Sequence, residues 1–194
     1  MYRNLIWDMP GDDNSIYLTF DDGPHPEITP YVLSQLAKHN AKATFFCIGK
    51  NVAEHPDVYK AILGAGHAVG NHTHNHLNGW KTTDRAYSEN IETAAGYINS
   101  RLFRPPYGRI KMAQAKRLLS ENPAWKIYMW DVLSGDFDTG ITPEQCAANV
   151  TENVCPGSII VFHDSDKAKE RLEYALPVVL EFCKNNNWNF KALS

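Results

Sequence analysis

Two histidines at four-residue spacing, His72 and His76, follow a pair of adjacent aspartates, Asp21 and Asp22, in this chain. Imidazole nitrogen and carboxylate oxygen suit zinc and neighbouring divalent ions, and three protein ligands leave one coordination position open for a water. A metal can acidify that water, so the residue types indicate a catalytic metal site rather than a structural one. The alternative is that the histidines only pack, cap or face solvent, which is common for an isolated pair at this spacing.

Further polar side chains of the kinds used in catalysis stand directly after apolar, β-rich runs. In the order of the runs, they are Asp21 and Asp22 after the first, His72 and His76 after the third, Arg104 after the fourth, Asp136 after the fifth and His163 after the sixth. In parallel α/β architectures the carboxyl ends of the strands share one edge, where active sites form. We therefore expect these residues to share one pocket, which strengthens the case for a metal site.

The members of this set have definite chemical uses. Gly23 and Pro24 break the first strand, so a turn there can bring both aspartates to one pocket, one as metal ligand and the other as base. His163 ends a buried-looking strand and can act as a general acid if a carboxylate keeps it charged. Arg104 can hold a catalytic carboxylate through a bidentate pair. The simpler alternatives are a solvated turn, a core histidine and a surface arginine.

The remaining histidines are expected to be structural or to face solvent. His74 lies two residues from each proposed ligand, so it should point away from the site if His72 and His76 share one side. The others are His25, His39, His55 and His67.

The β-rich runs alternate with longer amphipathic segments, which is the pattern of strand–helix units around a parallel sheet. The expected strands span residues 16–20, 43–48, 67–70, 102–104, 126–132, 158–162 and 188–192. The expected helices span residues 30–39, 56–64, 84–100, 110–121, 143–153 and 168–186. These elements can form an open sheet or a short closed barrel, and the pattern alone does not separate the two.

Two of the expected helices carry clear start signals. Thr29-Pro30 and Thr142-Pro143 each place a capping hydroxyl before a proline at the first helical position. Gln145 completes a capping box with Thr142. Both signals predict helices that begin at the proline.

The composition, with 43% hydrophobic and 21% charged residues, is that of an ordinary soluble globular protein. The net charge of -3 gives no basic footprint for nucleic acid, and no apolar run has the length of a transmembrane helix. Residues 1–8 lack the apolar segment of a secretory signal, so we expect a cytoplasmic protein or a mature or trimmed form of an exported one. Without a linker or repeat, residues 1–194 are expected to form one domain.

The cysteines predict free thiols, because none of them forms a Cys-x-x-Cys pair. Only Cys146 and Cys155 are close enough in sequence to suggest a local bridge, which their spacing does not decide. The other two are Cys47, in an apolar run, and Cys183.

Five motifs, in the family's order, make the chain resemble the polysaccharide deacetylase family, also called carbohydrate esterase family 4, between residues 17 and 164. The first motif is Thr19-Phe20-Asp21-Asp22-Gly23-Pro24, and the resemblance implies that Asp21 is the general base and Asp22 a metal ligand. The second is His72-Thr73-His74-Asn75-His76, whose first and last histidines bind the metal. The resemblance also implies an α/β fold, a distorted partial (β/α) barrel with about seven parallel strands.

The other three motifs supply the remaining groups. Arg104-Pro105-Pro106-Tyr107 matches the third, in which the arginine positions the base and the amide at Tyr107 helps to form an oxyanion hole. Ser134-Gly135-Asp136-Phe137 resembles the fourth, whose aspartate tunes the catalytic histidine, and Val161-Phe162-His163-Asp164 resembles the fifth, with His163 as general acid. Phe137 and Val161 stand where the family often has tryptophan and leucine, which reshapes acyl and sugar contacts. The resemblance places Phe137, Val161 and Pro105 against the substrate.

Together these residues imply metal-dependent removal of N-acetyl groups from N-acetylglucosamine-containing poly- or oligosaccharides, such as peptidoglycan or chitin-like chains, by a monomeric enzyme. We expect a divalent metal, Zn²⁺ first and Co²⁺ or another divalent ion as alternatives. One rival function is removal of O-acetyl esters from acetylated xylan. Another is non-catalytic carbohydrate binding with Trp80, Tyr107 or Trp130 as sugar platforms. A phosphoesterase would need more bridging carboxylates than we can place.

Overall fold

The computed structural model describes residues 5–9, 11 and 14–194. Residues 1–4, the first half of the segment predicted to lack a secretory signal, lie outside the described residues, as do residues 10, 12 and 13. None of the helices that the described residues form combines the length and the apolar composition needed to cross a membrane.

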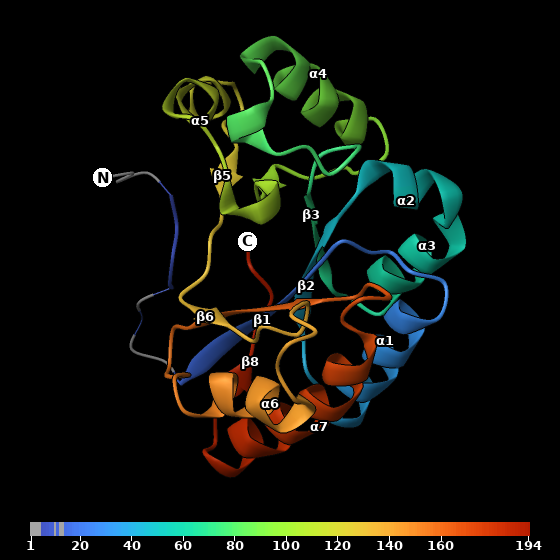
Figure 1. Ribbon diagram of the computed structural model, residues 1–194, viewed down its shortest axis with the longest axis vertical. Coiled ribbons are helices and arrows are strands. Elements are labelled where there is room, and N and C mark those ends of the chain that lie inside the picture. Colours follow the sequence, from blue (N-terminus) through green and yellow to red (C-terminus); the bar gives the residue numbers. More distant parts are fainter. Residues whose placement is uncertain (1–4, 10, 12–13) are drawn as a thin grey trace.

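A curled sheet of parallel strands forms the centre of the protein, and helices surround it (Figure 1). Its strands, in spatial order, are β5 (Lys126–Ile127), β4 (Leu102–Phe103), β3 (Ala68–Asn71), β2 (Ala43–Cys47), β1 (Ser15–Asp21), β7 (Ile159–His163) and β6 (Val132–Leu133). A short strand β8 (Asn189–Phe190) pairs with the start of β1. The sheet is a half-barrel, so the predicted partial barrel with about seven parallel strands is confirmed and the closed barrel is wrong.

The helices surround the sheet. They are α1 (Ile28–Lys38), α2 (Gly49–Glu54), α3 (Pro56–Gly64), α4 (Asp84–Ala95), α5 (Met112–Leu119), α6 (Pro143–Thr151) and α7 (Lys169–Asn185), with short 3₁₀ turns η1 (Gly79–Lys81) and η2 (Pro106–Gly108). Helices α4 and α5 lie together in the upper part of Figure 1, near β5, whereas α6 and α7 pack against each other in its lower part. Helices α1, α2 and α3 lie between these two groups. The site described below also lies between the two groups, where the strands end.

The expected strand over residues 126–132 is two separate strands, β5 and β6, at opposite edges of the sheet. In the chain between them, hydrogen bonds to side chains replace the regular pairing of strands. Carbonyls of Tyr128 and Met129 accept hydrogen bonds from Arg104, and the Asp131 carboxylate accepts from the Ser158 hydroxyl. An apolar run therefore predicted β structure correctly but not the interruption, because the groups that cause it lie far away in the sequence.

All the predicted helices are present, with three corrections, and the first is that α4 ends at Ala95 rather than at residue 100. Helix α2 was missed: it has six residues, no side-chain cap and no room for a repeating apolar pattern. Helix α1 begins at Ile28 rather than at Pro30, and Thr29 does not cap it. The Thr29 hydroxyl instead donates to the Asp164 carboxylate and accepts from the backbone N–H of His25. The Thr142 and Gln145 capping box of α6 is present as predicted.

The strands β1, β2 and β7 carry much of the apolar core between the sheet and helices α1, α6 and α7. All four cysteines are free, as expected, and Cys155 is the exposed one. The bridge between Cys146 and Cys155, which their spacing left open, is therefore absent.

Candidate active site

A groove of about 880 Å³ opens at the carboxyl edge of the sheet and gathers most of the predicted site residues. Those that line it are Asp21, Asp22, His72, His76, Tyr107, Phe137, Val161 and His163. Arg104, Asp136 and Pro105 do not line the groove and are buried behind it. The expectation that strand ends would bring these residues to one place is met, and Asp21 even lies opposite His163 in the register of β1 and β7.

Asp22, His72 and His76 form the one group of possible metal ligands among the described residues, with ligand atoms all within 4.8 Å of one another. The Nε2 atoms of His72 and His76 lie 3.7 and 3.2 Å from Asp22 Oδ1. His72 Nδ1 lies 2.8 Å from the carbonyl oxygen of Arg104, so Nδ1 carries the proton and Nε2 presents a lone pair to the group. The buried Asp22 Oδ1 accepts no hydrogen bond from the described residues. The lone pairs of these atoms converge on one place and no donor in the described part of the chain lies between them, which is the arrangement that a bound cation requires.

The charge states of the ligands suit the same purpose. Burial opposes ionisation of Asp22, but contact with His76 and the neighbouring His72 and His163 outweigh it and hold the pKa of the Asp22 carboxyl well below its usual range. Burial lowers the pKa of His72 to about 4, which keeps its imidazole neutral at physiological pH. A metal requires an ionised carboxylate and a neutral imidazole, so neither ligand needs to lose a proton at neutral pH.

The backbone holds two ligands in an uncommon conformation. Asp22 and His76 have φ values of 82° and 54°, and Thr73 between the histidines has 63°. Left-handed conformations of residues other than glycine are unfavourable and persist where surrounding contacts impose them, often at functional sites. One such contact is the hydrogen bond of 2.7 Å from the Asn51 amide to the carbonyl of Asp22.

Asp21 is paired with a fully buried arginine. Arg104 Nη1 donates to Asp21 Oδ1 at 2.8 Å and to the Thr19 hydroxyl at 2.7 Å, and Nη2 donates to the Met129 carbonyl at 2.8 Å. The guanidinium carbon also lies 4.2 Å from the centroid of the Phe46 ring. The predicted bidentate pair is therefore wrong: one nitrogen of Arg104 contacts the carboxylate, because Nη2 donates to the Met129 carbonyl instead. This leaves Asp21 Oδ2 without a hydrogen-bond partner in the described chain, next to the groove.

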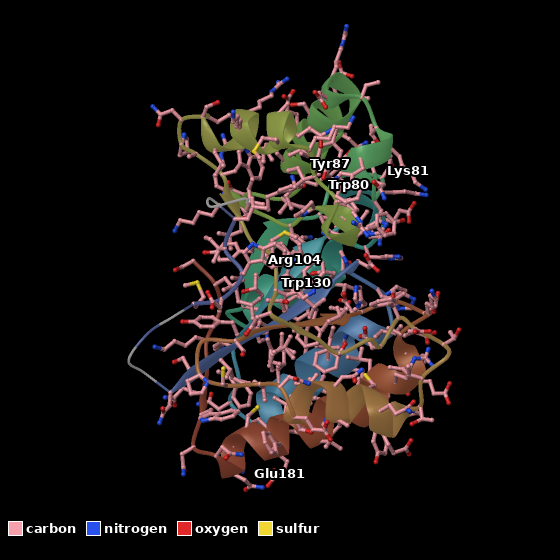
Figure 2. All side chains as sticks on the ribbon, turned by 60° about the vertical axis from the view of Figure 1, so that its left-hand side comes forward. Trp80, Lys81, Tyr87, Arg104, Trp130 and Glu181 are labelled. Atoms are coloured by element: carbon pink, nitrogen blue, oxygen red, sulfur yellow. The ribbon has the colours of Figure 1, made fainter. Side chains whose placement is uncertain are left out.

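Figure 2 shows Arg104 in the middle of the molecule with Trp130 beside it, and the guanidinium carbon lies 5.8 Å from that ring. Trp130 is half-buried and lines the groove, so it forms a wall between the arginine and solvent. This shielding keeps the interaction between Arg104 and Asp21 out of water, where it is strongest.

His163 is paired with a fully buried aspartate. Asp136 Oδ1 lies 2.7 Å from His163 Nδ1, and Asp136 Oδ2 accepts from the backbone N–H of His163 at 2.7 Å. Burial opposes protonation of His163, but Asp136 outweighs it, and with Asp21 and Asp22 raises the pKa of the imidazole to about 9. The Phe137 ring stands edge-on to the imidazole, 5.2 Å away between centroids. The ring is thus oriented, with Nε2 left for a substrate.

Tyr107 and Pro105 belong to the loop around η2. Tyr107 has φ of 60°, is 60% exposed, and its hydroxyl lies 3.0 Å from His76 Nδ1, so it orients a proposed metal ligand. Pro105 is buried, and its carbonyl accepts from the Gly108 N–H at 3.0 Å. Pro105 shapes this loop, and its contact with substrate stays a prediction.

Two residues at the site were not predicted from the sequence. The Asp164 carboxylate is not the partner of the His163 ring: its Oδ1 accepts from the Gly23 N–H at 2.9 Å and its Oδ2 from Thr29, which fixes the turn after Asp22. Burial raises the pKa of the Asp164 carboxyl to about 7. Arg171 on α7 donates to the carbonyl of Asp136 at 2.7 Å. The signal for Asp164 was its place directly after His163, whereas Arg171 had none.

His74 points away from the ligand group, as expected. Its ring stacks on Tyr97 at 5.6 Å between centroids, and it is not among the possible metal ligands.

Comparisons with known proteins show which family the chain resembles. Residues 8–121 match the family model described as polysaccharide deacetylase. The chain is 37% identical to a Bacillus cereus peptidoglycan-N-acetylglucosamine deacetylase over 80% of its length, although it spans only 58% of that relative. It is 38% identical to the chitooligosaccharide deacetylase of Azorhizobium caulinodans, covering 79% of this chain and 75% of the relative.

A solved structure is similar over almost the whole chain. The crystal structure of a peptidoglycan N-acetylglucosamine deacetylase, in complex with a benzamide compound, has a TM-score of 0.91 and 31% sequence identity. The match covers 98% of this chain and 91% of that one.

Proposed function

This chain belongs to the polysaccharide deacetylase family, and we propose that it hydrolyses the N-acetyl groups of N-acetylglucosamine-containing poly- or oligosaccharides and releases acetate. Relatives named for peptidoglycan and for chitooligosaccharides support this substrate class. We further propose that residues 1–194 form one catalytic domain and that it acts as a monomer.

The family is metal-dependent in general, and Asp22, His72 and His76 are the residues that would hold the ion. Two imidazoles and one carboxylate favour Zn²⁺, with Co²⁺ or another divalent ion as alternatives. When bound, the ion supplies Lewis acidity toward the acetyl carbonyl and makes a water more acidic. The converging lone pairs and the unpartnered Asp22 Oδ1 support the assignment.

The other residues of the site transfer protons, stabilise the oxyanion and contact the substrate. Asp21, held by Arg104, takes a proton from the attacking water through its free oxygen. The backbone N–H of Tyr107 donates to the oxyanion that forms at the acetyl carbonyl. His163, held by Asp136, donates its proton to the departing nitrogen. Val161 and Phe137 line the groove beside it, where they would contact the acetyl group and the sugar.

The observation that carries the proposal is the protonated His163 next to a carboxylate base. An amide needs a proton on its nitrogen before the bond breaks, because an amine anion is a very poor leaving group. A pKa of about 9 keeps His163 protonated at neutral pH, so that the proton is available. An ester leaving group needs this proton less, and for this reason we favour N-acetyl over O-acetyl substrates.

The test is acetate release by metal-loaded protein from N-acetylglucosamine oligomers and, separately, from acetylated xylan. We expect acetate from the oligomers, loss of activity after chelation, and recovery when Zn²⁺ or Co²⁺ is added back. Faster release from xylan would favour the esterase, and binding of the oligomers without any acetate would favour the non-catalytic alternative.

A further inference from the structure

The groove carries cations at both ends, and the proposed mechanism uses none of them. At one end Trp80, Lys81 and Arg109 line it, and we call this the tryptophan end. At the other end Phe137 and Lys167 line it, and we call this the phenylalanine end. The tryptophan end follows β3 and β4, the phenylalanine end follows β6 and β7, and β1 with both aspartates lies between.

The tryptophan end is held in place before any ligand arrives. The Trp80 indole N–H donates to the Ile110 carbonyl at 3.1 Å, and the Gly79 N–H donates to the Arg109 carbonyl at 3.1 Å. The Arg109 guanidinium lies 4.1 Å from the centroid of the Trp80 ring. A guanidinium stacked in this way keeps its N–H edge free for a carboxylate. Trp80 is 53% exposed, and Figure 2 shows it beside Lys81 at the outer part of the molecule.

The phenylalanine end places its cation over an aromatic ring in the same way. Lys167 Nζ lies 5.9 Å from the centroid of Phe137, the ring that stands against His163. The neighbouring Asp166 does not neutralise this lysine, because Asp166 faces a separate hollow, where its Oδ1 lies 3.2 Å from His25 Nε2.

No carboxylate in the described part of the chain forms an ion pair with Lys81, Arg109 or Lys167. The carboxylates that line the groove are Asp21 and Asp22, and both lie in its middle with other partners. A protein with a net charge of -3 thus presents a groove whose ends are positive. Cations without partners at the ends of a binding groove favour a ligand with negative charge at the matching places.

We propose that the two ends of the groove bind carboxylates on the sugars that flank the N-acetylated sugar, so that the preferred substrate is a glycan in which acidic sugars alternate with N-acetylglucosamine. This inference rests on the proposed function, which places the N-acetylated sugar over Asp22, His72 and His76. Glycan strands of peptidoglycan have this alternation where the stem peptide has been removed, because every second sugar then carries a free lactyl carboxylate. Where the peptide is attached, the same carboxyl group is an amide and offers no charge. A polymer of N-acetylglucosamine alone offers no anion to either end.

The experiment uses metal-loaded protein and three substrates: a neutral N-acetylglucosamine pentamer, peptide-free peptidoglycan strands, and the same strands with their carboxyl groups reduced to alcohols. We expect kcat/KM to be about 10-fold higher on the acidic strands than on the reduced strands at low ionic strength. This ratio should shrink toward one at about 0.5 M salt, since exposed ion pairs are screened.

The variants Lys81→Gln, Arg109→Gln and Lys167→Gln should each lower that ratio by about 2- to 3-fold, as expected for exposed ion pairs. Because the two ends lie on opposite sides of β1, the effects of Lys167→Gln and Arg109→Gln should multiply in the double variant. Lys38→Gln is the matched control: Lys38 is an exposed lysine on α1 outside the groove, and its loss should leave the ratio unchanged.

Equal rates on the acidic and reduced strands, or variants that slow both alike, would overturn the inference. If the pentamer still releases acetate in that case, the proposed function stands without it. No acetate from any of the three substrates would overturn the proposed function and this inference with it.

Discussion

The two sides of β1 each hold a pair of opposite charges, and the pairs are built in opposite ways. On the side of β4, the carboxylate of Asp21 faces the groove and the cation, Arg104, is its buried support. On the side of β7 and β6, the imidazole of His163 faces the groove and the carboxylate, Asp136, is its buried support. The supporting side chain is 0% exposed in both pairs, whereas Asp21 and His163 reach the groove.

In the proposed mechanism, this difference explains how neighbouring groups can perform opposite proton transfers at one pH. A buried permanent cation orients a carboxylate that is to accept a proton, and a buried carboxylate keeps protonated an imidazole that is to donate one. Each support is held by a further hydrogen bond: the Arg104 guanidinium donates to the Met129 carbonyl, and the Arg171 guanidinium donates to the backbone carbonyl of Asp136. We therefore propose that the supports determine which reacting group is the acid and which is the base.

The largest expected effect separates the acid from the rest of the site. His163→Ala should lower kcat on an N-acetylated oligomer by about 10²–10⁴-fold, because the amine leaves without a proton. On an activated acetate ester the same variant should lose less than about 10-fold, since that leaving group needs no proton. Parallel assays on the two substrates measure this, and equal losses would mean that His163 is not the leaving-group acid.

Arg104→Met tests the buried support on the base side. It leaves the Asp21 carboxylate buried without its cation, which should lower the free energy of unfolding by about 3–5 kcal/mol. The matched control is Arg101→Met, because Arg101 pairs with Glu121 at 2.8 Å on the surface and its loss should cost less than about 1 kcal/mol. Denaturant unfolding compares them, and similar losses would mean that burial of the Arg104 pair contributes little.

Asp136→Asn tests the buried support on the acid side through pH. Folding raises the His163 pKa from its ordinary 6.5 to about 9, so the protonated ring stabilises the fold fully below pH 6.5 and loses that contribution as pH rises through about 9. The basic limb of kcat/KM should move down by about 1–3 pH units in the variant, because burial remains and the carboxylate is gone. If the basic limb of the kcat/KM profile is at the same pH in the variant, Asp136 does not control the protonation of His163.

A smaller effect is expected at Asp164, which belongs to neither pair. Asp164→Ala removes the acceptor for the Gly23 N–H and the Thr29 hydroxyl, so the turn after Asp22 loosens and the metal Kd should rise about 10-fold. Asp164→Asn keeps an acceptor for Gly23 and should change the Kd by less than about 3-fold. Metal titration measures both, and an unchanged Kd in the alanine variant would make Asp164 a purely structural residue.

Much of the fold and the site could be predicted from the sequence because the signals are local. The parallel sheet follows from alternating apolar runs and amphipathic segments, and the residues after those runs had to meet at one edge. The spacing of His72 and His76 and the turn at Gly23 placed candidate ligands beside candidate bases. The resemblance to a family then separated the role of Asp21 from that of Asp22.

The parts that were missed depend on contacts between distant residues. Asp164 reaches Gly23 across 141 positions, and Arg171 reaches the Asp136 carbonyl across 35. The break between β5 and β6 follows from bonds to Arg104, which no local pattern records. The pairing of Arg104 with a single oxygen of Asp21 likewise depends on the Met129 carbonyl, which takes its second nitrogen.

The central claim is that two adjacent residues at the end of β1 have different roles: Asp21 is the general base and Asp22 is a metal ligand. Metal content and kcat, measured on Asp21→Asn and Asp22→Asn purified in parallel, test it most directly. We predict that Asp21→Asn keeps its metal while kcat falls by about 10²–10⁴-fold, and that Asp22→Asn loses most of its metal. Loss of metal from Asp21→Asn to the same extent, or full metal content in Asp22→Asn, would contradict the account.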